Sequence, residues 1–222
     1  MAPGARDCKR LTLPAVARTI HGVNGSRPLA FRLRRTRGGN FVELLSQKGT
    51  DMIGEKMEAA LNLQMNREFF NSRLYLAMAA YFDSIDLEGA TQWMELQAEE
   101  ERGHALRIYR HLKERGARPV LNDLEAPPEE WDSPLAAFQA AYEHECNVSR
   151  EFDEHMELAR EENDNASLLF LEWFVDEQVE EEDSVLSVVK KLQRVGDAPG
   201  GLFMVDRMLG ERQEGAEEED EG

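Results

Sequence analysis

From Met52 onward, apolar residues recur every three or four positions, which is the spacing of one face of an α-helix. The eight prolines leave residues 29–118 and 135–198 free of this helix breaker. Turn-forming clusters at 83–86 and 163–167 divide each of these two stretches. The pattern predicts four helices, over 52–83, 87–115, 134–161 and 165–195, and a short fifth helix within 197–210 that begins near Pro199.

The connections decide how these helices are arranged. The first two helices and the last two are joined by short turns, so each pair is expected to form an antiparallel hairpin. About 18 residues with three prolines separate the second helix from the third, and fully extended they reach on the order of 60 Å. Gly116 and Gly196 are expected to end helices, and Ser133 with Pro134 to begin one. The fold class is therefore all-α, a four-helix bundle with one long crossover between its second and third helices.

Each apolar stripe is interrupted by polar residues where a core side chain is expected. The interruptions are Glu68, then Glu101 and His104, then Glu145, then Gln178 and Glu181. Counted from the turn near residue 85, Glu68 lies 17 residues before it and Glu101 16 after it. Counted from residue 163, Glu145 lies 18 before it and Glu181 18 after it. All four helices are therefore expected to contribute side chains to one polar layer in the middle of the bundle.

Four buried carboxylates would place four negative charges in a medium of low dielectric constant, and the stripes supply no Lys or Arg to offset them. Such groups must be protonated, hydrated or bound to cations. Glu101 and His104 are one helical turn apart, so they can hold one ion from one helix. Oxygen ligands with a single nitrogen suit Fe(II) or Mn(II) better than structural zinc. The pattern favours a dinuclear metal site over the alternative, a hydrated polar network.

Composition narrows the class of protein. The longest apolar run, residues 74–82, is far shorter than the ~20 residues that cross a bilayer, so no membrane partner is expected. Two cysteines, Cys8 and Cys146, cannot form a disulfide framework, which favours a reducing cytoplasm. Residues 1–50 hold ten of the 26 basic and two of the 44 acidic residues, so the rest of the chain carries a net charge of −26. A body this acidic would repel nucleic acid and attract cations, although a surface suited to high salt explains many of these charges equally well.

The two ends of the chain lack helical periodicity. Residues 1–51 are basic and are expected to be a disordered extension; a transit peptide, or a start codon misplaced upstream of Met52, are the alternatives. Residues 211–222 form an acidic tail that is too charged to fold. Residues 52–210 are expected to form the one folded domain.

Four segments carry a resemblance to a known family. They are MNREFFNSRLY around Glu68, AEEERGHALRIY around Glu101 and His104, AYEHE ending at Glu145, and FLEWFVDEQVEEE around Gln178 and Glu181. Together they resemble the non-haem ferritins of bacteria and archaea, in the ferritin-like diiron superfamily, over residues 52–210. The resemblance implies that Glu68, Glu101 and His104 bind a first iron, and that Glu101, Glu145 and Glu181 bind a second. It also implies that Gln178 completes this ferroxidase centre and that Tyr75 lies beside it.

The resemblance further implies iron storage and detoxification. The chain would oxidise Fe(II) to Fe(III) with dioxygen or hydrogen peroxide and deposit ferric mineral in a homo-oligomeric, cytoplasmic cage of twenty-four subunits. Glu100, Glu177 and Glu180 match a third iron position beside the pair, for which the alternative is a solvated acidic face.

Departures from related proteins narrow the choice of function. Bacterioferritins have a haem-binding methionine where this chain has Arg102, so no haem is expected. Diiron oxygenases carry a second ExxH motif, which the segment Gln178–Glu181 lacks, so an oxygenase is disfavoured. A structural bundle with a vestigial site remains as the alternative from a different class.

Overall fold

The computed structural model describes residues 52–196 and 198–212, so the expectations for residues 1–51 and for most of the acidic tail lie outside the described residues. The described part contains five α-helices and no strand: α1 (Glu55–Ser84), α2 (Glu88–Glu114), α3 (Pro134–Glu162), α4 (Asn165–Val195) and α5 (Pro199–Leu209). The all-α class is confirmed, and every helix begins and ends close to its predicted bounds.

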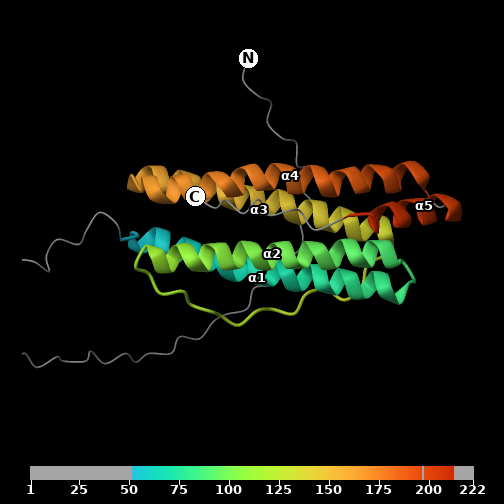
Figure 1. The fold of residues 1–222 in the computed structure, drawn as a ribbon, viewed down its shortest axis with the longest axis horizontal. Coiled ribbons are helices and arrows are strands. Elements are labelled where there is room, and N and C mark those ends of the chain that lie inside the picture. Colours follow the sequence, from blue (N-terminus) through green and yellow to red (C-terminus); the bar gives the residue numbers. More distant parts are fainter. Residues whose placement is uncertain (1–51, 197, 213–222) are drawn as a thin grey trace, which may run out of the picture. The chain divides into compact units, whose positions relative to one another are not determined.

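The four long helices form two hairpins, α1 with α2 and α3 with α4, packed into one bundle (Figure 1). The crossover between α2 and α3 runs along the bundle past α1, and α5 packs against α2 and α4 at one end (Figure 1). The predicted topology is therefore confirmed. None of the helices in the described part has a stretch long and apolar enough to cross a membrane.

Side chains of α1 hold the crossover in place. Asn62 Oδ1 accepts a hydrogen bond from the backbone N–H of Val120 at 2.7 Å. One turn further along, Asn66 accepts from the backbone N–H of Asn122 at 2.8 Å and donates to the carbonyl oxygen of Val120 at 2.7 Å. One face of α1 thus provides hydrogen bonds to backbone groups of the crossover, which has no regular structure, and these bonds fix its path.

Several helix ends follow the signals in the sequence. Ser133 Oγ accepts from the backbone N–H of Ala136 at 3.1 Å, and Gly116 and Gly196 follow α2 and α4 with positive φ angles of 74° and 53°. The acidic residues of the turn at 83–86 do not cap α2. Asp86 itself adopts a left-handed φ of 58°, and the N-cap position of α2 belongs to Leu87, which has no polar side chain.

Asp206 of α5 supplies the missing cap instead. Its Oδ1 accepts from the backbone N–H of Ala90, in the first turn of α2, at 2.8 Å. Gly89 makes this contact possible, since a Cβ there would lie 1.8 Å from the carbonyl oxygen of Asp206. A carboxylate also suits the positive end of a helix dipole. This contact therefore ties the start of α2 to α5.

The buried apolar side chains form two clusters. One includes Phe82, Phe138 and Val205 and lies at the end of the bundle that α5 covers. The other includes Leu61 and Phe174 and lies toward the opposite end. The polar residues of the four stripes separate the two clusters.

Candidate metal centre

The polar residues that interrupt the four stripes meet in one layer of the bundle. α1 contributes Glu68, α2 contributes Glu101 and His104, α3 contributes Glu145, and α4 contributes Gln178 and Glu181. All six residues are at most 5% exposed. Each helix thus delivers its polar residues at the same height, because residues equally far from a hairpin turn face one another.

Two groups of potential ligand atoms share one histidine. Atoms of Glu68, Glu101 and His104 all lie within 4.8 Å of one another, as do atoms of His104, Glu177 and Glu181. Within the ExxH motif, His104 Nδ1 lies 3.6 Å from Glu101 Oε2. The first group is the set that the resemblance implied for the first iron. The second group shares only Glu181 with the set implied for the second iron, since it contains His104 and Glu177 rather than Glu101 and Glu145. Glu145 belongs to neither group.

Glu145 is held from two sides. The hydroxyl of Tyr75 donates to Glu145 Oε1, and the amide of Gln178 donates to Glu145 Oε2 at 3.1 Å. Burial, and then the charges of Glu145 and Glu101, raise the pKa of Tyr75 well above its ordinary value of 10. The phenol therefore stays protonated and remains a donor to the carboxylate.

The carboxylates of the layer repel one another. Burial, and then the charge of Glu101, raises the pKa of Glu68 well above its ordinary range. Burial, and then the charges of Glu145 and Glu181, does the same for the pKa of Glu101. Burial, followed by Glu145, raises the pKa of Glu181 to about 8. Divalent cations would offset this repulsion, and carboxylates with a single imidazole form a donor set that fits iron.

Three buried amides, which we call the second layer, contact these carboxylates: Gln64, Asn71 and Gln97. The sequence analysis did not identify them as part of the site. Gln64 Nε2 donates to Glu68 Oε1 at 2.7 Å, and Asn71 Nδ2 donates to Glu68 Oε2 at 2.8 Å. Gln97 Nε2 donates to Glu181 Oε2 at 2.7 Å. Gln64 lies four residues before Glu68 and Asn71 three residues after it, and this helical spacing could have identified both. Gln97 has the same spacing, four residues before Glu101, but it bonds to Glu181 on a different helix, which spacing along one helix does not indicate.

The three carboxylates expected at a third iron position have different surroundings. Glu177 is half-buried; burial raises its pKa, nearby His104 opposes that rise, and Glu180 and Glu100 add to it. Glu180 is exposed. Glu100 forms an ion pair with Arg212, at 2.5 Å between Oε2 and a guanidinium nitrogen. The structure therefore brings Glu177 to the layer and leaves Glu100 paired with a cation of the chain itself.

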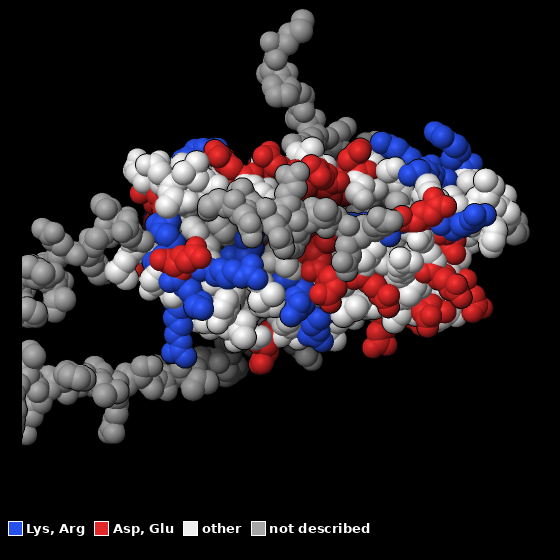
Figure 2. Space-filling view, viewed as in Figure 1, with Lys and Arg blue, Asp and Glu red and all other residues white. Residues whose placement is uncertain are grey.

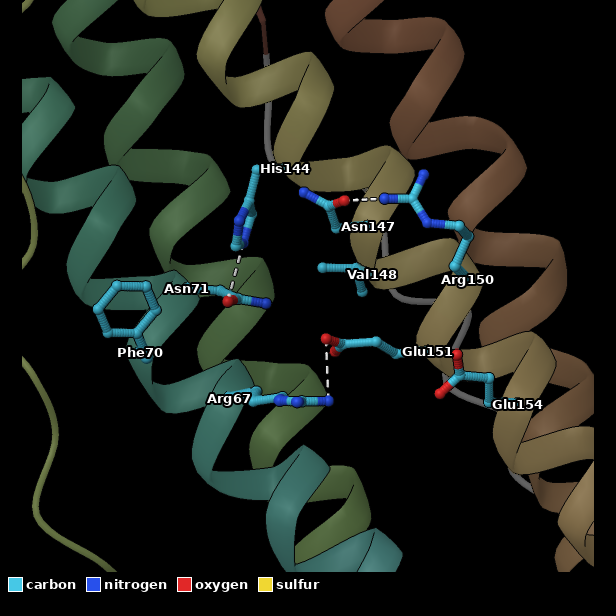
Figure 3. A pocket seen from close by; sticks show the side chains of 9 residues that line it. All are labelled: Arg67, Phe70, Asn71, His144, Asn147, Val148, Arg150, Glu151 and Glu154. Atoms are coloured by element: carbon cyan, nitrogen blue, oxygen red, sulfur yellow. Dashed lines mark hydrogen bonds and ion pairs between the residues drawn. The ribbon is translucent and has the colours of Figure 1, made fainter. Parts of the chain in front are cut away.

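A pocket of about 560 Å³ opens between α1 and α3, and Figure 3 shows the nine side chains that line it. Its charges are paired in part, with Arg67 lying 2.9 Å from Glu151. Its lining includes Asn71, whose amide also donates to Glu68. Asn71 therefore connects the pocket lining to the carboxylate layer.

Charge is unevenly distributed over the face drawn in Figure 2. Acidic side chains gather over the N-terminal half of α2 and along α4, whereas basic side chains gather over the C-terminal half of α2. An acidic surface of this kind attracts cations.

Comparison with known proteins relates this arrangement to a family. A family model described as a ferritin-like domain matches residues 58–195. A bacterial non-heme ferritin of Bacteroides fragilis (strain 638R) is 39% identical over 161 residues, which cover 72% of this chain and 100% of that protein. A bacterial non-heme ferritin of Staphylococcus aureus (strain USA300) is 38% identical over 161 residues, covering 72% of this chain and 97% of that protein.

Solved structures of ferritins are similar to this chain in both fold and sequence. The open-pore ferritin of the archaeon Archaeoglobus fulgidus matches with a TM-score of 0.72 and 49% identity, covering 72% of this chain and 99% of the other. A closed form of that ferritin, engineered by mutagenesis, matches with the same TM-score and identity and with 98% of its length covered. The matched family region includes every residue of the buried polar layer. The chain therefore belongs to the ferritin family, as a non-haem ferritin.

Proposed function

We propose that this chain is a ferroxidase subunit, which oxidises Fe(II) to Fe(III) in its carboxylate layer. The ferric product is stored as mineral inside a cytoplasmic homo-oligomeric cage of twenty-four copies. The observation that carries the proposal is the layer itself. Its four buried carboxylates repel one another; amides and a phenol donate hydrogen bonds to them, and the imidazole of His104 lies 3.6 Å from Glu101.

Iron is the substrate of this site. Glu68, Glu101 and His104 are assigned to one ion, and Glu101, Glu145 and Glu181 to the other, with Gln178 beside them. Carboxylate oxygens stabilise Fe(III) more than Fe(II), which makes oxidation more favourable. Two Fe(II) ions give up two electrons, which with two protons convert dioxygen into hydrogen peroxide, or hydrogen peroxide into two molecules of water.

Tyr75 and Gln178 position Glu145 in this scheme. Each donates to a different oxygen of the carboxylate, so they hold it in one orientation. Because Tyr75 remains protonated, it can keep this hydrogen bond while the charge of the layer changes.

Glu100, Glu177 and Glu180 are assigned to a third iron position. The grouping of Glu177 with His104 and Glu181 supports this assignment. Glu100 must exchange its contact with Arg212 for the ion in order to take part.

Iron uptake by the purified protein tests the proposal. Fe(II) is added without oxygen, air is then admitted, and ferric absorbance is followed as more iron is supplied. Uptake that continues beyond two irons per chain into a soluble core is the expected result. A stop at two irons would indicate an oxygenase-like site, and no oxidation above background would indicate a structural bundle.

A pair of variants on α2 links this activity to the layer. Since changing a residue that merely supports a metal ligand costs about 10- to 100-fold, Glu101→Gln, which changes a proposed ligand, should slow oxidation by at least about 100-fold. Glu99→Gln is the matched control, because Glu99 is exposed and lies 3.4 Å from the guanidinium of Arg102. Equal rates in the two variants would contradict the assignment of the site.

A further inference from the structure

Gln97 makes two different hydrogen bonds with the two ends of its amide. Its Nε2 donates to Glu181 Oε2 at 2.7 Å, and its Oε1 accepts from Arg212 at 2.9 Å. The side chain is fully buried. Arg212 and Glu181 are therefore connected through one amide, although they lie on different segments of the chain.

The chemistry of Arg212 allows only one orientation of this amide. A guanidinium group is always protonated and can only donate, so it must face the oxygen of Gln97. The NH₂ group of Gln97 is then left facing Glu181. In the reverse orientation, an amide oxygen would face an oxygen of Glu181, and the two would repel each other whenever Glu181 is ionised.

Arg212 is itself fixed by two further contacts. Its guanidinium forms the 2.5 Å ion pair with Glu100, and its central carbon lies 4.5 Å from the centre of a Trp93 ring. Both partners lie on α2, as does Gln97. A planar cation held by an ion pair and an aromatic face loses little further freedom when it also bonds an amide.

The same arrangement recurs at two other amides of the second layer. His155 Nε2 lies 3.0 Å from Gln64 Oε1, and Gln64 Nε2 donates to Glu68. His144 Nε2 lies 2.9 Å from Asn71 Oδ1, a contact that Figure 3 draws inside the pocket, and Asn71 Nδ2 also donates to Glu68. In each case the amide oxygen faces away from the carboxylates toward an outer side chain.

We propose that Arg212 is a positioning residue for Glu181: by binding the oxygen of Gln97, it keeps the NH₂ group of that amide directed at the carboxylate. Glu181 is thereby held in one orientation before a cation arrives, so less reorganisation accompanies metal binding. The inference rests on the proposed function, because Glu181 is one of its iron ligands.

Binding of Co(II) to the full-length protein, followed by its visible absorption under anaerobic conditions, provides the test. We expect Arg212→Ala to weaken Co(II) binding about tenfold and to change the shape of the absorption bands, which report ligand geometry. Arg212→Lys should restore part of the affinity, since an ammonium group can also donate to Gln97. Arg207→Ala is the matched control, because Arg207 is an exposed arginine of α5.

A double-variant cycle separates this role from a general effect of the ion pair with Glu100. In a Gln97→Leu background, Arg212→Ala should cause no further loss, because the amide through which it acts is gone. A loss as large as in the parent chain would overturn the inference, and so would an Arg212→Ala protein that matches the parent in affinity and spectrum. If the parent chain bound no Co(II), the proposed function itself would fail, and the inference with it.

Discussion

Glu181 receives opposing influences from its neighbours. Gln97 donates a hydrogen bond to it, which favours the ionised form. Burial and the charge of Glu145 favour the protonated form, and together they outweigh the hydrogen bond, since the pKa rises to about 8. The raised pKa of Glu181 thus reflects both the burial of the layer and the repulsion between its carboxylates.

This raised pKa predicts how stability depends on pH. Folding raises the pKa of Glu181 above its ordinary value of 4.5, so the folded state binds the proton more tightly, and the stability that this provides at low pH is lost as the pH rises toward 8. In chelator-treated protein, we expect the free energy of unfolding to fall with pH more steeply than in Glu181→Gln, by up to about 1.4 kcal/mol per pH unit between about 5 and 8. Urea unfolding at several pH values measures the difference.

Glu172→Gln is the control for this measurement, because Glu172 is exposed on the same helix. That variant should follow the pH dependence of the parent chain. The prediction is wrong if Glu181→Gln follows it too.

The sequence allowed some of these residues to be predicted and not others, for a physical reason. A polar residue that interrupts an apolar stripe is visible in the helical period, which is how Glu68, Glu101 and Glu145 were selected. Gln64 lies on the same face of α1 as Glu68, but a glutamine in a stripe looks the same whether it contacts a ligand or water. Arg212 follows α5, so its contact with Gln97 depends on the path of the chain after that helix, which helical periodicity does not predict.

Among the helices, α5 depends most on tertiary contacts. Its apolar residues, and Pro199 at its start, predicted that it exists, but they did not indicate which helices it contacts. Its packing partner is set by Asp206, which caps the start of α2, and by Gly89, which leaves room for the backbone of α5. The four long helices differ in this respect, because their short turns and one long crossover already determine how they pair.

Gly89→Ala should therefore detach α5 from the start of α2. The added Cβ would lie 1.8 Å from the carbonyl oxygen of Asp206, a backbone atom that cannot rotate away. We expect a loss of about 1–3 kcal/mol in the free energy of unfolding, as is typical of overpacking. Denaturant unfolding measures it.

Gly200→Ala offers a matched control in α5 itself. A Cβ at Gly200 meets no atom within 4 Å, so this substitution should be neutral, or stabilising by up to about 1 kcal/mol through helix propensity. Similar losses in the two variants would show that the close contact at Gly89 is unimportant.

At the scale of the whole molecule, charge differs between the N-terminal extension and the rest of the chain. Residues 1–50 hold ten basic and two acidic residues, whereas the rest is strongly acidic. The ferritin-like family model begins at residue 58, after this basic region. The extension is therefore expected to contribute nothing to the bundle core.

Deleting residues 1–51 tests this expectation. We expect the shortened chain to assemble and to oxidise Fe(II) like the parent, because every residue of the proposed site lies after the deletion. Light scattering at physiological salt should give the mass of a twenty-four-subunit cage for both. A monomer or simple dimer of the parent would exclude the cage, and a loss of assembly or activity in the shortened chain alone would give the extension a role.

The division of the apolar core into two clusters has a consequence for protein design. Replacing buried charged groups with well-packed apolar side chains is often neutral or stabilising by about 1–4 kcal/mol. A version of this bundle with leucine throughout the polar layer would join the two clusters into one continuous core and would serve as an inert, heat-resistant scaffold. The natural chain instead keeps buried carboxylates between the two clusters, and this layer is the proposed iron site.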